Sequence, residues 1–412
     1  MQDLKLLQAE AARCLFCKNT PCKNACPAHN DIPEFMRLVK DGKFSEAREL
    51  WHETSNLPEL CGALCPKETL CEGFCTLNKL NKPLAIGWME SEIAKLFADT
   101  TDFPEAPNGK RHLVIGLGPA GIANALKMAE FGYEVTAIEG DSQLGGAIFH
   151  SVPDFRFDPN TLAVYEKRFR DLGIVVHYDT IVGRDVMLDD LIKAYDSVFI
   201  AMGLDLPIEI NIEHEDIRIH YAIELLQKKR YSLSELKRLL GPTVGVVGLG
   251  NVAIDIARVL ARLGKEVHII YRRTLEEAPA SHKEIADAVA DGVQVHELLG
   301  PIAFRKLADR KILDCEKTCV IKDASHPRGR IEVIPGANQE FILDDLVFAI
   351  GQKSSDIVFR GSKVKLNPDK GCCYTNHPNV YVGGDRVNKD KRIIDAMVSG
   401  IEVAAKIRRE LG

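Results

Sequence analysis

One short pattern occurs twice in this chain and limits the fold more than any other feature. A buried strand, a glycine-rich turn and a helix occupy residues 113–130 and again residues 244–262. The short apolar runs that read as strands are HLVIG, EVTAIE, IVVHYD, SVFIAMG, TVGVVG, EVHIIY, LVFAIG and VYVGG. Strands that alternate with helices are typical of parallel sheets built from βαβ units. We therefore predict an α/β protein with two Rossmann-like nucleotide-binding domains.

The first glycine motif is complete and specific. Residues 114–121 read VIGLGPAG, which is a full G-x-G-x-x-G between a strand and a helix. Gly116 permits the tight turn, Gly118 lets the backbone approach a pyrophosphate, and Gly121 lets helix and strand pack closely. The next strand ends in Glu139, where an acid accepts hydrogen bonds from ribose hydroxyls. A tight turn without a ligand is the alternative interpretation.

The second glycine motif carries information about the nucleotide. It reads GLGNVA over residues 248–253, with alanine at the third glycine position. Its second strand is followed by Arg272 and Arg273, where an NAD-preferring site carries an acid. An acid repels a 2′-phosphate, whereas arginine binds it. The pair predicts NADPH, with NADH as the second choice; two solvated surface arginines are the alternative interpretation.

Cysteine is concentrated near the N-terminus, where 8 of the 12 cysteines precede residue 76. The spacings are Cys14-x2-Cys17-x4-Cys22-x3-Cys26-Pro27 and Cys61-x3-Cys65-Pro66-x5-Cys71-x3-Cys75. The sequence starts without the basic and apolar regions of a signal peptide, so we expect a cytoplasmic location, where disulfides are rare. Thiolates at such spacings bind inorganic clusters, and eight ligands suffice for two [4Fe–4S] clusters. Structural zinc, which uses more widely separated pairs of cysteines, is the alternative.

Length and charge narrow the class of protein. The 412 residues exceed the ~250–300 that one hydrophobic core accommodates. A net charge of -6 argues against a nucleic-acid partner, and no apolar run reaches the ~18 residues of a membrane span.

Residues 1 to about 100 read as helical: apolar side chains spaced i, i+3, i+4, i+7 from Ile32 to Val39 predict a helix capped by Asn30 or Asp31. Residues 100–110 read as a linker.

The order of these motifs resembles one family over about residues 10–405. The segments that carry the resemblance are EAARCLFCKNTPCKNACP, CGALCPKETLCEGFC, VIGLGPAG, GLGNVAID, YRRT, AIGQ and VGGD. They resemble the glutamate synthase small (beta) subunit family of FAD and iron–sulfur NAD(P)H oxidoreductases, which includes the electron-input subunit of bacterial dihydropyrimidine dehydrogenase. The resemblance implies FAD at the first glycine motif and NADPH at the second. The predicted cofactor-binding residues are Gly116, Gly118, Pro119, Ala120, Gly121, Glu139, Gly145, Gly146, Gly203, Gly248, Gly250, Asn251, Val252, Arg272, Arg273, Gly351, Gly384 and Asp385.

The resemblance also implies how the cluster ligands are shared. One cluster would use Cys14, Cys17, Cys22 and Cys75, and the other Cys26, Cys65, Cys71 and Glu90. Counting cysteines alone instead prefers Cys61 over Glu90. The remaining cysteines, Cys315, Cys319, Cys372 and Cys373, are expected to be small buried hydrophobes.

The expected organisation is a helical domain with two [4Fe–4S] clusters (1–105), a FAD-binding domain in two parts (106–240 and 346–412) and an NAD(P)H-binding domain (241–345). The family implies that electrons pass from NADPH through FAD and the clusters to a partner subunit, and the two arginines favour a partner of the glutamate synthase type. The alternatives are the NAD-linked input subunit of dihydropyrimidine dehydrogenase, a ferredoxin:NADP oxidoreductase subunit, and a cluster-holding partner without turnover.

Hydride transfer needs no side-chain acid or base, so no catalytic residue is predicted. No redox cysteine pair lies near residues 145–153, which argues against a disulfide reductase.

Overall fold

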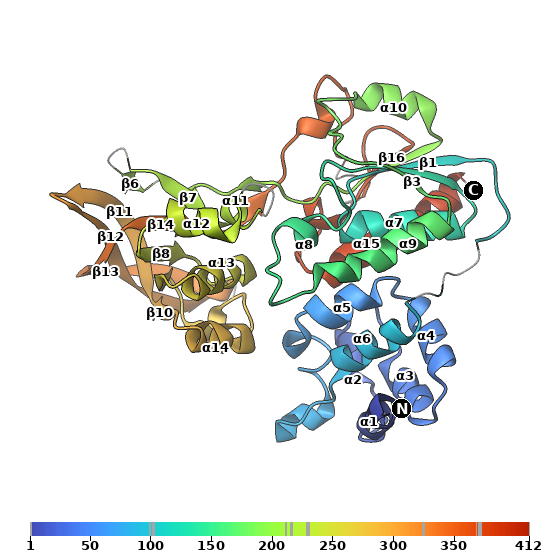
Figure 1. Ribbon diagram of the computed structural model, residues 1–412, viewed down its shortest axis with the longest axis horizontal. Helices are drawn as coiled ribbons and strands as arrows, with labels where there is room; N and C mark the ends of the chain where they lie inside the picture. Colours follow the sequence, from blue (N-terminus) through green and yellow to red (C-terminus); the bar gives the residue numbers. More distant parts are fainter. Residues whose placement is uncertain are drawn as a thin grey trace. The chain divides into compact units, whose positions relative to one another are not determined.

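The structure is a computed structural model in which the chain forms two compact units (Figure 1). Unit 1 comprises Met1–Phe149, Asp154–Asp205 and Ser354–Gly412, and unit 2 comprises His150–Pro153 and Leu206–Lys353. The structure describes residues 2–98, 100, 104–210, 212–214, 217–227, 231–323, 326–367, 369 and 373–411. Unit 1 therefore contains the eight N-terminal cysteines and the first glycine motif, and unit 2 contains the second glycine motif.

The N-terminal part of unit 1 is helical. Its elements are α1 (Gln2–Ala11), α2 (Pro21–Ala25), α3 (Ile32–Lys40), α4 (Phe44–His52), α5 (Pro58–Leu64), the 3-10 turns η1 (Lys67–Thr69) and η2 (Thr76–Leu80), and α6 (Ile86–Leu96). Helix α3 has the predicted bounds and buries its predicted apolar face. Of the two predicted caps, Asp31 is the one used, since its side chain accepts a hydrogen bond from the Glu34 N–H at 3.3 Å.

The rest of unit 1 is built on a five-stranded parallel sheet with the order β16-β4-β1-β2-β3. Its strands are β1 (Arg111–Ile115), β2 (Glu134–Ile138), β3 (Val175–His177), β4 (Ser197–Ile200) and β16 (Val380–Val382). Its helices and 3-10 turns are α7 (Pro119–Glu130), α8 (Ala147–His150), η3 (Pro159–Leu162), α9 (Ala163–Asp171), α10 (Leu188–Ala194), η5 (Ile357–Phe359), η7 (Gly384–Arg386) and α15 (Ile393–Leu411). The predicted parallel α/β architecture is confirmed. Pairing of β16 with β4 brings the C-terminal Gly-Gly-Asp segment to the same sheet as the first glycine motif.

Unit 2 has its own five-stranded parallel sheet with the order β10-β9-β8-β14-β7. The elements are β7 (Ile219–Tyr221), α11 (Ala222–Leu226), α12 (Leu233–Leu239), β8 (Thr243–Val247), α13 (Asn251–Arg262), β9 (Glu266–Tyr271), η4 (Leu275–Glu277), α14 (His282–Ala290), β10 (Gln294–Glu297) and β14 (Asp345–Phe348). The sequence places residues 206–240 and 346–353 with the first nucleotide domain, but in the structure they belong to unit 2. The physical reason is strand pairing, because β14 pairs with β8 and β7 pairs with β14.

A second sheet in unit 2 was not predicted. Strands β11 (Leu299–Leu307), β12 (Arg310–Asp323) and β13 (His326–Leu343) form an antiparallel sheet, with short β6 (Glu213–His214) at its edge. Its inward face buries Phe304, Leu313 and Phe341 against the parallel sheet. The chain enters and leaves unit 2 through β5 (Leu206–Pro207) and β15 (Gln352–Lys353), which pair antiparallel with each other.

Among the described residues, no helix is both long enough and apolar enough to cross a membrane. The longest of the described helices, α15, has 19 residues and carries four charged side chains near its end, at Lys406, Arg408, Arg409 and Glu410.

Candidate functional site

The first glycine motif connects β1 to α7 through a turn that needs glycine. Gly116 has a φ of +92°, and a Cβ there would lie 2.7 Å from the Ala201 carbonyl oxygen. A Cβ on Gly121 would lie 1.9 Å from the Gly116 carbonyl oxygen, so helix and strand pack in contact. Around Gly118, by contrast, a Cβ would meet nothing within 4 Å. Space is therefore left open where a pyrophosphate would approach the N-terminus of α7.

Two further predicted segments lie against this turn. The Gly145 N–H donates to the Leu117 carbonyl at 2.8 Å, and a Cβ on Gly146 would lie 2.9 Å from the Gly118 Cα. Buried Glu139 accepts hydrogen bonds from the Leu117 N–H at 2.5 Å and the Asp141 N–H at 2.9 Å. Burial raises the pKa of Glu139. The Glu139 carboxylate thus holds the backbone of the glycine turn in place. The ribose contact expected of Glu139 remains a prediction.

The Gly-Gly-Asp segment supplies buried polar atoms that have no partner. It follows β16 and forms η7, and a Cβ on Gly384 would lie 2.9 Å from the Ala120 Cβ of the first motif. In the described part of the chain, the buried Asp385 Oδ1, Arg386 Nε and Asn388 Nδ2 lack a hydrogen-bond partner. Burial raises the pKa of Asp385 to about 6. Buried polar atoms without partners are costly, so these residues fit a polar group such as the ribityl chain of FAD.

The second glycine motif repeats this geometry in unit 2. A Cβ on Gly248 would lie 2.4 Å from the Ala349 carbonyl oxygen, which places β8 against the end of β14. Gly250 precedes α13, which begins at Asn251 and Val252. Ala253, at the third glycine position, is fully buried. The N-terminus of α13 is thus arranged to receive phosphates.

The two predicted arginines at the end of β9 differ in their surroundings. The Arg272 side chain is exposed. The Arg273 guanidinium instead donates to the backbone carbonyls of Arg328 and, at 3.2 Å, Gly329. Only Arg272 therefore presents a guanidinium that is free of such backbone contacts.

The first four predicted cluster ligands lie together in the helical segment. Burial, and then the neighbouring thiols of Cys17 and Cys75, raise the pKa of Cys14. Burial and the thiols of Cys14 and Cys75 raise the pKa of Cys22 to about 11. We refer to Cys14, Cys17, Cys22 and Cys75 as the first ligand group.

The other predicted ligands line one cavity, together with Cys61. We refer to Cys26, Cys61, Cys65, Cys71 and Glu90 as the second ligand group. Burial raises the pKa of Cys65 and of Cys71 well above the usual thiol range. Cys61 is also buried. Both candidates for the fourth ligand, Cys61 and Glu90, therefore line the cavity with the other three cysteines of the group. Among the described residues, no group of three or more His, Cys, Asp or Glu side chains is arranged so that it could hold a single metal ion.

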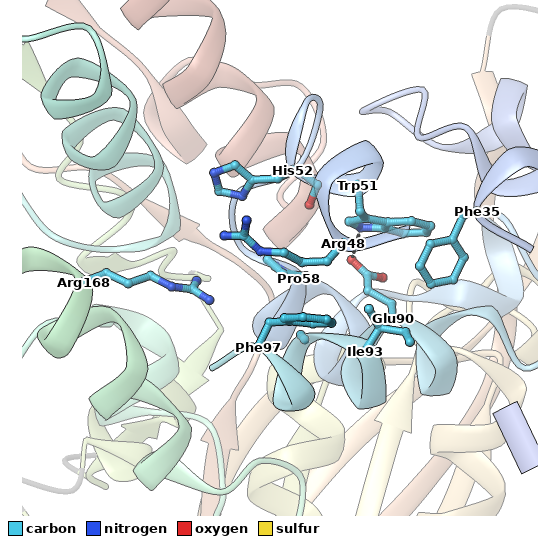
Figure 2. Close-up of a pocket in the computed structure, with 11 residues that line it drawn as sticks. Phe35, Arg48, Trp51, His52, Pro58, Glu90, Ile93, Phe97 and Arg168 are labelled. Atoms are coloured by element: carbon cyan, nitrogen blue, oxygen red, sulfur yellow. Dashed lines mark hydrogen bonds between the residues drawn. The ribbon is translucent and has the colours of Figure 1, made fainter. Parts of the chain in front are cut away.

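Glu90 is held by a residue that the sequence did not identify. Trp51 Nε1 donates to Glu90 Oε1 at 2.8 Å, as Figure 2 shows. Burial raises the pKa of Glu90 to about 8. Figure 2 also shows Phe35 and Ile93 beside the carboxylate, in a pocket that Arg48, His52 and Arg168 line as well. A separation of 39 residues between Trp51 and Glu90 leaves no local sequence signal for this contact.

The second ligand group also lies against the first nucleotide-binding fold. Ile394 of α15 lines its cavity, and the Cys61 Sγ is 4.0 Å from the Met397 Sδ. Helix α15 in turn packs on α7 of the first glycine motif. Glu59 of α5 and Arg168 of α9 also join the helical segment to this fold, through a buried ion pair at 2.7 Å.

The later cysteines lie outside both groups. Cys315 is fully buried in the apolar core between the two sheets of unit 2, as expected of a small hydrophobe. Cys319 and Cys373 are half-buried rather than buried. Cys372 lies outside the described residues.

Comparisons with known proteins match both parts of the chain. Residues 2–101 match the family described as dihydropyrimidine dehydrogenase domain II, 4Fe-4S cluster, and residues 110–404 match the pyridine nucleotide-disulphide oxidoreductase family. The glutamate synthase [NADPH] small chain of Escherichia coli (strain K12) is 30% identical over 96% of this chain and 90% of its own length. The chain belongs to the glutamate synthase small-subunit family. The predicted resemblance is thereby confirmed.

Other relatives extend the comparison. The NAD-dependent dihydropyrimidine dehydrogenase subunit PreT of E. coli (strain K12) is 29% identical over 98% of this chain and 93% of its own. Among solved structures, Mycobacterium tuberculosis FprA in complex with NADPH has a TM-score of 0.58 at 18% identity, over 73% of this chain and 86% of that one. This last likeness concerns the fold. As a member of the glutamate synthase small-subunit family, the chain is an NAD(P)H-dependent flavoprotein oxidoreductase, and the match over residues 2–101 favours iron–sulfur over zinc.

Proposed function

We propose that this chain oxidises NADPH and delivers the electrons, by way of FAD and two [4Fe–4S] clusters, to a separate partner subunit. The observation that carries the proposal is the position of the second ligand group, whose cavity is shared with α15 of the first nucleotide-binding fold. Ligands for a one-electron centre and residues for a flavin thus lie within one unit. Bound FAD supplies the exchange between a two-electron hydride donor and one-electron acceptors.

The residues of the chain would bind and position these groups. Gly118 and Gly146 have no side chain, so the FAD pyrophosphate would approach the backbone closely there. The Asp385 Oδ1, which has no hydrogen-bond partner in the described residues, would bind the FAD ribityl region. The first ligand group would hold one cluster. In the second, we propose Cys26, Cys65, Cys71 and Glu90 as the four ligands, with Cys61 as a packing residue against Met397. We assign no side chain as a catalytic acid or base.

For the nucleotide, the exposed Arg272 supports NADPH over NADH. A guanidinium binds the 2′-phosphate that distinguishes the two nucleotides. The same residue supports a glutamate synthase-type partner, because the matching relative of that name is NADPH-linked whereas PreT is named as NAD-dependent.

Anaerobic purification of the native complex would test the proposed function. We expect about eight irons and one FAD per chain, together with a co-purifying large subunit. Zinc without iron would contradict the cluster assignment. Full turnover of a metabolite by the isolated chain would contradict the need for a partner.

Replacing Asp385 with alanine should lower the FAD content of the purified chain, because the substitution removes the buried acceptor at η7. FAD per chain is measured by its absorbance after denaturation. Asp390→Ala is the control, since Asp390 is exposed and pairs with Arg392 at 3.0 Å. Equal FAD contents in the two variants would remove Asp385 from the flavin site.

A further inference from the structure

The antiparallel sheet of unit 2 is fastened to the end of β9, where the nucleotide's ribose is expected. The Thr318 hydroxyl of β12 donates to the Arg272 carbonyl at 3.0 Å. The Leu298 N–H donates to the Arg273 carbonyl at 3.1 Å. With the hydrogen bonds from the Arg273 guanidinium to the carbonyls of Arg328 and Gly329, four hydrogen bonds join this corner to the sheet and to Leu298, which precedes it. Arg273 therefore serves to hold β13 in place.

The segment that Arg273 holds carries another arginine. Arg328 lies near the start of β13, and its side chain is exposed. Gly329, the next residue, has a φ of +67°, and a Cβ there would lie 2.7 Å from the Ile321 carbonyl oxygen of β12. This position of β13 therefore requires glycine, directly beside the backbone from which the Arg328 side chain leaves.

Arg328 and Arg272 both lie close to the end of β9, because the Arg328 carbonyl accepts a hydrogen bond from Arg273 and Arg272 directly follows Tyr271. Burial raises the pKa of Tyr271, the last residue of β9, and Arg328, Arg273 and Arg272 each lower it. Among these arginines Arg328 has the largest effect on Tyr271. Glu277, an acid that raises the pKa of Tyr271, is already engaged, because its Oε2 accepts from the Thr274 N–H at 3.2 Å and hydroxyl at 3.1 Å. Within the described residues, Arg272 and Arg328 form no ion pair with a carboxylate, so both charges are available to an anion.

We propose that Arg328, supplied by the β12–β13 hairpin, binds the 2′-phosphate of NADPH together with Arg272, while Arg273 positions Arg328. This rests on the proposed function, since it names the residues that select its nucleotide. Two guanidinium groups bind a phosphate dianion better than one, because each provides a fork of N–H donors. The sheet that sequence reasoning missed would thus form one wall of the nucleotide site.

The test uses two ligands that differ only in the 2′-phosphate, 2′,5′-ADP and 5′-AMP, titrated calorimetrically into the full chain. Arg328→Ala and Arg272→Ala should each weaken 2′,5′-ADP binding by roughly 10- to 100-fold, and both should leave 5′-AMP binding unchanged. Unchanged 5′-AMP binding also establishes that the variants are folded. Arg330→Ala is the matched control, because Arg330 lies on the same strand and pairs with Glu332 at 2.5 Å; it should alter neither affinity.

The outcomes separate this inference from the function on which it rests. Loss of 2′,5′-ADP affinity in Arg272→Ala but not in Arg328→Ala would overturn the role of Arg328 and leave the proposed function standing. Equal losses in Arg328→Ala and Arg330→Ala would overturn it too, since a diffuse charge effect would explain both. Equal affinities of the unaltered chain for the two ligands would overturn both this inference and the preference for NADPH.

Discussion

Replacing Cys65 with serine should remove about half of the iron from the chain, leaving about four irons of eight, and should abolish NADPH-driven electron delivery to the partner. Cys65 lines the cavity of the second ligand group, which adjoins the flavin-binding fold. Loss of a centre at that position interrupts the route, although the first ligand group remains intact. Iron is counted colorimetrically, and electron delivery is followed as product formation in the reconstituted complex.

Two kinds of comparison sharpen this experiment. Cys315→Ser is the control, because Cys315 lies in the core of unit 2 and should retain all of the iron. Glu90→Ala and Cys61→Ser then separate the two candidates for the remaining ligand, with iron loss expected only in the first. Full iron content and normal electron delivery in Cys65→Ser would show that the second ligand group holds no cluster.

Replacing Arg168 with leucine should lower the free energy of unfolding of unit 1 by about 3–5 kcal/mol, the typical cost of leaving one member of a buried ion pair without its partner. Arg168 and Glu59 have side chains that are 8% and 3% exposed, with N and O atoms 2.7 Å apart. Tyr165 also donates to Glu59, at 2.6 Å. Without the arginine, the Glu59 carboxylate would remain buried with this one hydroxyl donor. Urea unfolding of the full chain, followed by circular dichroism, measures the change.

A neighbouring pair on the same helix provides the control. Lys167 pairs with Asp171 at 2.8 Å, with side chains 36% and 37% exposed, so Lys167→Leu should cost about 0–1 kcal/mol. The double variant Glu59→Leu with Arg168→Leu should be more stable than Arg168→Leu alone, because no charge is left buried. If Arg168→Leu cost no more than Lys167→Leu, the buried pair would not stabilise the contact between the cluster-binding helices and α9.

The sequence predicted those features that depend on local pattern. All eight apolar runs are strands, because continuous apolar stretches of that length are buried in parallel sheets. Helix α3 was predicted because four apolar residues recur at helical spacing over a proline-containing first turn. The two glycine motifs were predicted because the turn glycines, Gly116 and Gly248, have a positive φ and leave no room for a side chain.

Features that depend on distant residues were missed. Strands β11–β13 alternate charged and apolar residues irregularly, and a register shift between Glu316 and Thr318 interrupts the period of two. The ion pair of Glu59 with Arg168 spans 109 residues, so neither side chain has a local pattern that reveals its partner. Arg273 was predicted to bind a phosphate, but its guanidinium contacts backbone carbonyls 55 and 56 residues away. The sequence pattern thus drew attention to the arginine at the end of β9 but did not reveal the backbone carbonyls that its side chain contacts.

The antiparallel pairing of β5 with β15 has a consequence for how such proteins change their electron donor. The chain leaves unit 1 after Asp205 and returns to it at Ser354, and Asp205 joins the returning segment through two 2.7 Å hydrogen bonds to Ser355. Residues 206–353 therefore form an insertion whose two ends lie side by side. A segment with closely spaced ends can be exchanged for the corresponding segment of a relative with little disturbance to its host. Nucleotide preference could thus be inherited as a module, separately from the residues that hold flavin and clusters.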